Sequence, residues 1–132
     1  MAGGLRFRSE ANLVSSLGSP YLLAGSPIQI VPALTQANTP LPNAIARIGV
    51  YRLVIEALVT ATIQFQDNLV GGSPATTLLS AQYNLTANGF LILDTPINGD
   101  PWWQCRGGAG LQMLITGAGA SVAADIWYAV GA

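Results

Sequence analysis

The chain offers few side chains that can perform chemistry, because it contains no histidine and no lysine. Catalytic pairs of serine or cysteine with histidine are therefore absent, and so are the serine–lysine variants. A metal site would have to be built from one thiol, Cys105, and six carboxylates that show no recognisable ligand spacing. These carboxylates belong to Glu10, Glu56, Asp67, Asp94, Asp100 and Asp125. We expect no cofactor, no metal and no enzymatic activity.

Two aspartates keep one enzymatic alternative open. Asp94 and Asp100 flank a turn predicted at residues 98–101, so their carboxyl groups could lie close enough for acid–base hydrolysis of a glycoside. Aspartates that cap a turn are the commoner interpretation. Asp94 and Thr95 also resemble the start of the Asp-Thr-Gly segment of aspartic proteases, but Pro96 stands where that segment needs glycine.

Trp102 and Trp103 are the side chains best suited to bind a partner. Adjacent residues of a strand point to opposite faces, so one indole can enter the core while the other faces a surface. An exposed tryptophan can anchor a protein interface or stack on a sugar ring. Core packing, a subunit or partner interface and a carbohydrate site all remain open, and both residues are candidate interface residues.

The composition indicates a protein that acts through its surfaces and not through a chemical reaction. Only 8% of the 132 residues are charged, whereas a soluble domain usually has about 25%. Excess apolar surface with few charges is typical of subunit interfaces, which favours an obligate oligomer over a neutral monomer.

The net charge of −1 gives no electrostatic footprint for nucleic acid or for an anionic membrane. No stretch is a convincing run of about 20 apolar residues, and residues 1–10 lack the order of a signal peptide, so we expect a soluble protein.

Residues 1–45 differ from the rest, since they hold five of the eight prolines and only one short predicted strand, at residues 28–31. They are too apolar for a solvated tail. We predict an extended N-terminal arm that docks on a neighbour; the alternative is that this segment supplies the first strands of the sandwich. The candidate interface residues of the arm are Arg6, Arg8, Glu10, Tyr21 and Leu22.

Residues 46–132 are predicted to form a β-sandwich domain. Over residues 52–66 seven apolar side chains alternate at period two, which predicts a long strand, bent or divided by a bulge, with one face on the core. Further strands are predicted at 76–83, 90–93, 102–105, 111–116 and 121–130, with turn signals such as Asn88-Gly89 between them. About seven or eight short strands predict an all-β fold: an antiparallel β-sandwich, jelly roll or closed barrel.

Four segments of the carboxyl-terminal half carry a family resemblance. They are Phe-Leu-Ile-Leu at 90–93, Pro-Trp-Trp at 101–103, Gly-Leu-Gln-Met-Leu-Ile at 110–115 and Ala-Ser-Val-Ala-Ala-Asp-Ile-Trp-Tyr-Ala-Val at 120–130. Together they resemble the head decoration, or cement, proteins of tailed bacteriophages that have a jelly-roll-like fold. The resemblance implies a homotrimer on the capsid surface of the virion, made in the host cytoplasm. Its partner would be the major capsid protein, whose neighbouring subunits it would clamp without catalysis.

A second function remains open beside this one. A glycan- or receptor-binding head domain of a phage fibre or tail protein is also trimeric and rich in β-structure. It would need an exposed aromatic platform, which Trp102 or Trp103 would supply.

Overall fold

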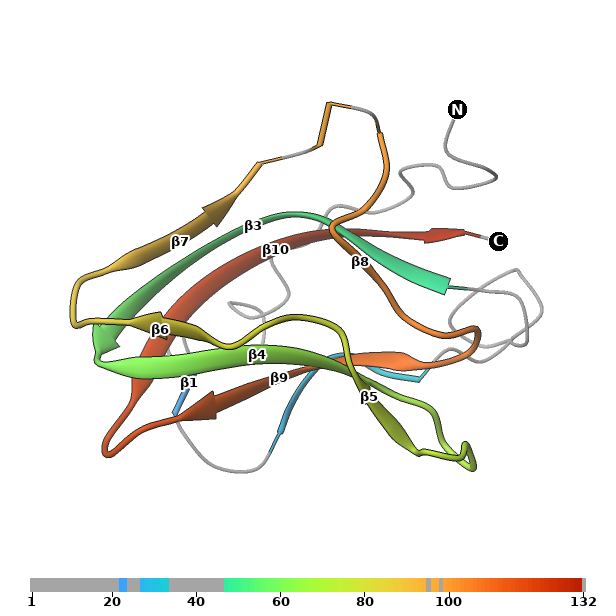
Figure 1. Cartoon of the computed structure of the whole chain (residues 1–132), viewed down its shortest axis with the longest axis horizontal. Helices are drawn as coiled ribbons and strands as arrows, with labels where there is room; N and C mark the ends of the chain where they lie inside the picture. The colour runs from blue at the N-terminus through green and yellow to red at the C-terminus, as the bar shows by residue number, and fades with distance from the viewer. Residues whose placement is uncertain (1–21, 24–26, 34–46, 95, 98, 132) are drawn as a thin grey trace.

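The computed structural model describes residues 22–23, 27–33, 47–94, 96–97 and 99–131 (Figure 1). These residues form ten strands and no helix, so this part of the chain has no helix that could cross a membrane. The strands are β1 (Leu22–Leu23), β2 (Ile28–Val31), β3 (Arg47–Val59), β4 (Ala61–Asn68), β5 (Thr76–Leu78), β6 (Tyr83–Leu85), β7 (Phe90–Leu93), β8 (Trp103–Gln104), β9 (Gly110–Thr116) and β10 (Ser121–Gly131). The predicted all-β class is confirmed.

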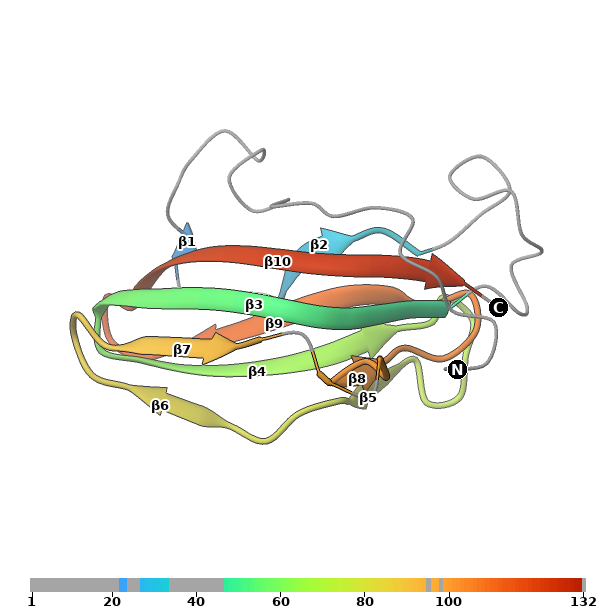
Figure 2. The ribbon, with the colours of Figure 1, turned by 90° about the horizontal axis from the view of Figure 1, so that it is seen from above.

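The strands form two antiparallel sheets that pack against each other. Sheet A has the order β1-β10-β3-β7, with β8 also paired to β3; sheet B has the order β2-β9-β4-β5, with β6 also paired to β4. Figure 2 shows β1 and β2 along one side of the sandwich and β6 and β7 along the other. β5 and β6 pair with successive parts of β4, and β7 and β8 pair with successive parts of β3. If each of these two pairs is counted as one strand position, each sheet has four positions, and their order is that of a jelly roll.

The long alternating segment forms two strands in different sheets. Its odd-numbered apolar residues face the core on both sides of the break, and the buried ones are Leu53, Ile55, Ala57, Ala61, Ile63 and Phe65. The two strands are joined by a reversal of the chain at Thr60, not by a bulge, and β3 and β4 run in opposite directions (Figure 1). Gly117 packs against this corner with φ of 132°, and a Cβ there would lie 3.0 Å from the carbonyl oxygen of Thr60. This close approach explains why glycine is needed.

The strand predicted at residues 76–83 is interrupted. The structure has β5 and β6 with residues 79–82 between them, and both strands pair with β4. In the gap the backbone N–H of Phe65 donates to the hydroxyl of Ser80 at 2.9 Å, and Gln64 donates to the Ser80 carbonyl at 3.0 Å. A serine side chain thus takes a bond that a regular ladder would give to a backbone carbonyl.

The described part of residues 1–45 belongs to the sandwich. β1 pairs with β10 and β2 pairs with β9, and Ile30 and Val31 are buried in the core. The boundary predicted at residue 45 is therefore wrong for these strands, because their backbones complete both sheets; the alternative, that this segment supplies the first strands, holds for them. Residues 1–21, 24–26 and 34–46 lie outside the described residues, so an arm there stays a prediction.

Candidate interaction surface

The two adjacent tryptophans point to opposite sides, as the period of a strand predicts. Trp103, in β8, turns inward and stacks on Phe65 of β4 with ring centroids 4.9 Å apart and planes inclined by 25°. Tyr83 lies against the same indole at 6.3 Å. Because its ring packs against the core, Trp103 has a packing role, which corrects its choice as an interface residue.

Trp102 faces outward and is 43% exposed. Its indole N–H donates to the carbonyl of Asp94 at 2.7 Å, and its backbone N–H donates to the carbonyl of Val50 at 2.7 Å. Both polar groups are satisfied within the chain. The side chain therefore presents apolar surface to a partner.

Arg52, on the outer side of β3, contacts the residue that follows β7 and an aromatic ring of β10. Its Nε donates to the carboxylate of Asp94 at 3.1 Å, and its guanidinium lies 4.4 Å from the ring centroid of Trp127 in β10. Arg52 shares its strand face with Glu56, but its ion-pair partner is Asp94. The two side chains of this pair are 37% and 79% exposed, so it contributes little to stability and mainly fixes the arginine over the ring.

An apolar strip runs along the outer side of sheet A next to these residues. We call Val54, Phe90, Ile92 and Trp102 the outer apolar surface. Phe90 is 57% exposed and Ile92 55% exposed, and Ile92 lies opposite Val54 in the register between β3 and β7. Sequence reasoning did not select Phe90 and Ile92, although the run at 90–93, apolar on both faces of a strand, was the available signal.

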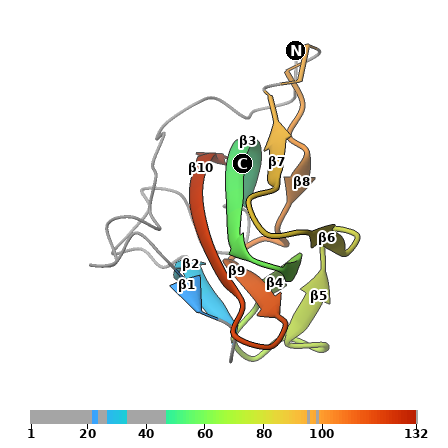
Figure 3. The same ribbon diagram turned by 90° about the vertical axis from the view of Figure 1, so that its left-hand side faces the viewer.

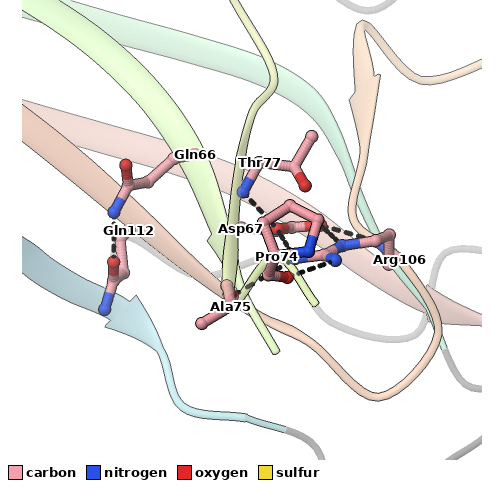
Figure 4. A network of polar contacts seen from close by, with 7 residues as sticks. All are labelled: Gln66, Asp67, Pro74, Ala75, Thr77, Arg106 and Gln112. Carbon is pink, nitrogen blue, oxygen red and sulfur yellow. Dashed lines mark hydrogen bonds and ion pairs between the residues drawn. The ribbon is translucent and has the colours of Figure 1, made fainter. Parts of the chain in front are cut away.

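The outer side of sheet B is different, because amide side chains occupy it. Gln66 of β4 donates to Gln112 of β9 at 2.6 Å (Figure 4). Gln112 in turn donates to Gln29 of β2 at 3.2 Å. Gln29 closes the row by donating to the carbonyls of Val31 and Leu111. These groups satisfy one another, so the exposed apolar side chains of sheet A are the stronger candidate for a partner.

A buried ion pair fixes one end of the sandwich. The carboxylate of Asp67, in β4, is fully buried and accepts hydrogen bonds from the Arg106 backbone and guanidinium and from the Thr77 backbone N–H, all between 2.8 and 3.0 Å (Figure 4). Arg106 also donates to the carbonyls of Pro74 at 2.7 Å and Ala75 at 3.2 Å. One arginine thus holds three segments together, and the contacts are structural.

The network also sets the titration of its members. Burial alone would raise the pKa of Asp67, but the hydrogen bonds and charge of Arg106 and the bond from Thr77 lower this pKa below its usual value. The bond to Asp67 raises the pKa of Arg106. Burial, aided by the nearby charge of Asp67, raises the pKa of Cys105 to about 12, so this thiol is protonated at neutral pH.

The carboxylates proposed for hydrolysis occupy exposed positions. Asp94 is bound to Arg52, and Asp100 is exposed near Tyr51. Burial, followed by the charge of Asp100, raises the pKa of that tyrosine. A carboxyl group that acts as a general acid is usually held in an apolar pocket, whereas both of these aspartates are exposed. Within the described ranges no three His, Cys, Asp or Glu side chains gather as metal ligands.

The candidate residues near the amino terminus are only partly described. Arg6, Arg8, Glu10 and Tyr21 lie outside the described residues. Leu22 lies in β1, where its backbone pairs opposite Val122. Of the seven candidate interface residues, the structure therefore places the side chains of the two tryptophans.

The fold and the surface together define an all-β jelly-roll sandwich with one outer face amide-rich and the other partly apolar. No protein-family model, no curated protein and no solved structure matches the chain.

Proposed function

We propose that this protein decorates and stabilises a bacteriophage capsid by bridging coat subunits, as a homotrimer. The observation that supports it most is the outer apolar surface, where Phe90, Ile92 and Trp102 are exposed in a chain with 5 basic and 6 acidic residues. Exposed apolar side chains gathered on one face usually mark an interaction site. Jelly rolls recur among viral shell proteins, which makes the fold compatible with this role.

The proposed mechanism is mechanical. A subunit that binds two coat subunits at once favours the assembled shell by mass action. The outer apolar surface is bordered by the ion pair of Arg52 with Asp94 and by two carboxylates, that of Glu56 opposite Phe90 and that of Asp125 opposite Val54. Burial of apolar area would supply most of the binding energy. Because salt screens charges but not apolar burial, binding should change little between low and moderate ionic strength.

Co-sedimentation with purified capsids tests the proposal. Wild-type protein should sediment with capsids that lack it and should form trimers, alone or joined to one another, in light scattering at micromolar concentration. Trp102→Ala should weaken capsid binding, whereas Val70→Ala, a 77% exposed apolar residue outside this surface, should not. A monomer that ignores capsids would remove the basis of the proposal.

The exposed indole of Trp102 favours one second candidate, a glycan- or receptor-binding head domain of a phage fibre or tail protein. Lectin domains also use jelly rolls, and aromatic faces stack on sugar rings. Trp102→Ala should then abolish binding on a glycan array while leaving the oligomer intact. Absence of any glycan bound by the wild type would count against this candidate.

A further inference from the structure

β7 is an edge strand without the usual protection. It pairs with β3 on one side, and no strand of the described residues pairs with its other side; Figure 3 shows β7 beside β3. Its sequence, Phe-Leu-Ile-Leu, contains no charge and no proline. Natural edge strands usually carry lysine, proline or a bulge that prevents pairing with another chain. This edge is suited to accept a further strand.

The orientation of β7 determines what its open side offers. The side chains of Phe90 and Ile92 are exposed, whereas Leu91 and Leu93 pack toward the core. The N–H of Ala57 donates to the carbonyl of Gly89 at 2.9 Å. Since bonded and non-bonded pairs alternate along an antiparallel ladder, the backbone groups of Leu91 and Leu93 face β3. The N–H and C=O groups of Phe90 and Ile92 therefore face the open side.

We propose that β7 pairs with β7 of a second copy, antiparallel, about a two-fold axis that passes through Leu91. This register sets Phe90 opposite the partner's Ile92, so the residues with outward backbone groups bond to each other. It also places both side chains on the same face, an aromatic and β-branched pair that stabilises cross-strand contacts. If the register between the two β7 strands shifted by one residue, a side chain that points toward the core would lie opposite one that points outward.

A second copy suits this edge better than an unrelated strand, because β7 is complementary to itself in both hydrogen-bond position and side-chain face, as a two-fold contact requires. Pairing brings no like charges together within the strand. The first charge beyond it, Asp94, is already paired with Arg52. The contact is between copies of this chain and does not depend on a coat partner; a two-fold link would add to the three-fold contact of a trimer.

Proline at position 92 tests the pairing selectively. Ile92→Pro removes an N–H that points to the open side and leaves the bonds between β7 and β3 in place, as proline at a strand edge can. Sedimentation should show at least a tenfold weaker two-fold association. Ile92→Lys is the second test variant, to be used if circular dichroism shows that Ile92→Pro does not fold, and it should also weaken the association. Val70→Lys should leave the association unchanged. Equal association of wild type and Ile92→Lys overturns the proposal.

Cysteine cross-linking tests the register. Phe90→Cys mixed with Ile92→Cys should give a disulfide-linked dimer on mild oxidation, because these positions lie opposite each other. Each variant alone should not, since two identical positions would lie about 8 Å apart, too far for a disulfide. The native Cys105 is buried and does not interfere. Absence of the mixed dimer, or equal cross-linking by either variant alone, overturns the register.

Discussion

Trp103 of β8 stacks on Phe65 of β4 with their ring centroids 4.9 Å apart, so one aromatic pair joins sheet A to sheet B. Its neighbour Trp102 faces outward from the same short segment. The two indoles therefore have separable roles, one in holding the sandwich together and one in presenting apolar surface.

Alanine substitution should separate these roles. Trp103→Ala is expected to lower the free energy of unfolding by about 3 kcal/mol, because it leaves a cavity between the sheets. Trp102→Ala should cost less than about 1 kcal/mol, as is usual for a surface position. Urea unfolding followed by circular dichroism measures both. Similar losses for the two variants would contradict the assignment of Trp103 to the core.

Asp67 should make stability depend on pH in the acid range. Its pKa is lower in the folded chain than in the unfolded one, so its contribution is complete above the unfolded value of about 3.9 and is lost as the pH falls through the folded pKa. Wild-type stability should therefore decline from about pH 5 downward. Asp67→Asn should be less stable at pH 7, by on the order of 2 kcal/mol, and should decline less in acid. Thermal melts from pH 7 to pH 3 measure this. Parallel curves for the two proteins would contradict it.

Gly110 should be needed for β2 to pack on β9. A Cβ at this position would lie 2.5 Å from the carbonyl oxygen of Val31 and 2.7 Å from the backbone nitrogen of Ala33. Gly110→Ala is therefore expected to displace β2 and to cost about 1–3 kcal/mol. Hydrogen exchange should show faster exchange at Ile28–Val31, with Val70→Ala, a change at a 77% exposed position, as the control. Unchanged protection of β2 would mean that the strand is not held as described.

The strands that could be predicted are those whose side chains alternate in polarity. Over residues 53–57 and 61–65 the odd-numbered residues face the core and the even-numbered ones face outward, because a sandwich buries one face of each strand. At the start of β3 the buried residues Ile48 and Val50 are even-numbered, since the register with β10 shifts between Arg52 and Val50. The turn at Asn88 was also predictable, and its φ of 66° is one that asparagine tolerates. The same period of two explains why the side chains of Trp102 and Trp103 point to opposite faces.

What could not be predicted depends on contacts between distant segments. Asp67 and Arg106 are 39 positions apart, and neither residue type nor spacing indicates that they meet. The corner at Thr60 does not interrupt the period of two, since Ala57 and Ala61 are both buried, although Val59 at the corner is 41% exposed. Arg52 and its partner Asp94 are 42 positions apart and meet only because β3 and β7 pair in the register of the sheet.

Cys105 should be unreactive in the folded protein. Burial, with the charge of Asp67, raises its pKa to about 12, so roughly one thiol in ten thousand is ionised at pH 8, and the thiolate is the reactive form. A thiol reagent at pH 8 should therefore leave the native protein unmodified and modify one thiol per chain in denaturant. Ile92→Cys, which adds a thiol at a 55% exposed position, should react at once under native conditions and serves as the matched control. Native Cys105 that reacts as fast as this added thiol would show that the end of the sandwich held by Asp67 and Arg106 opens readily.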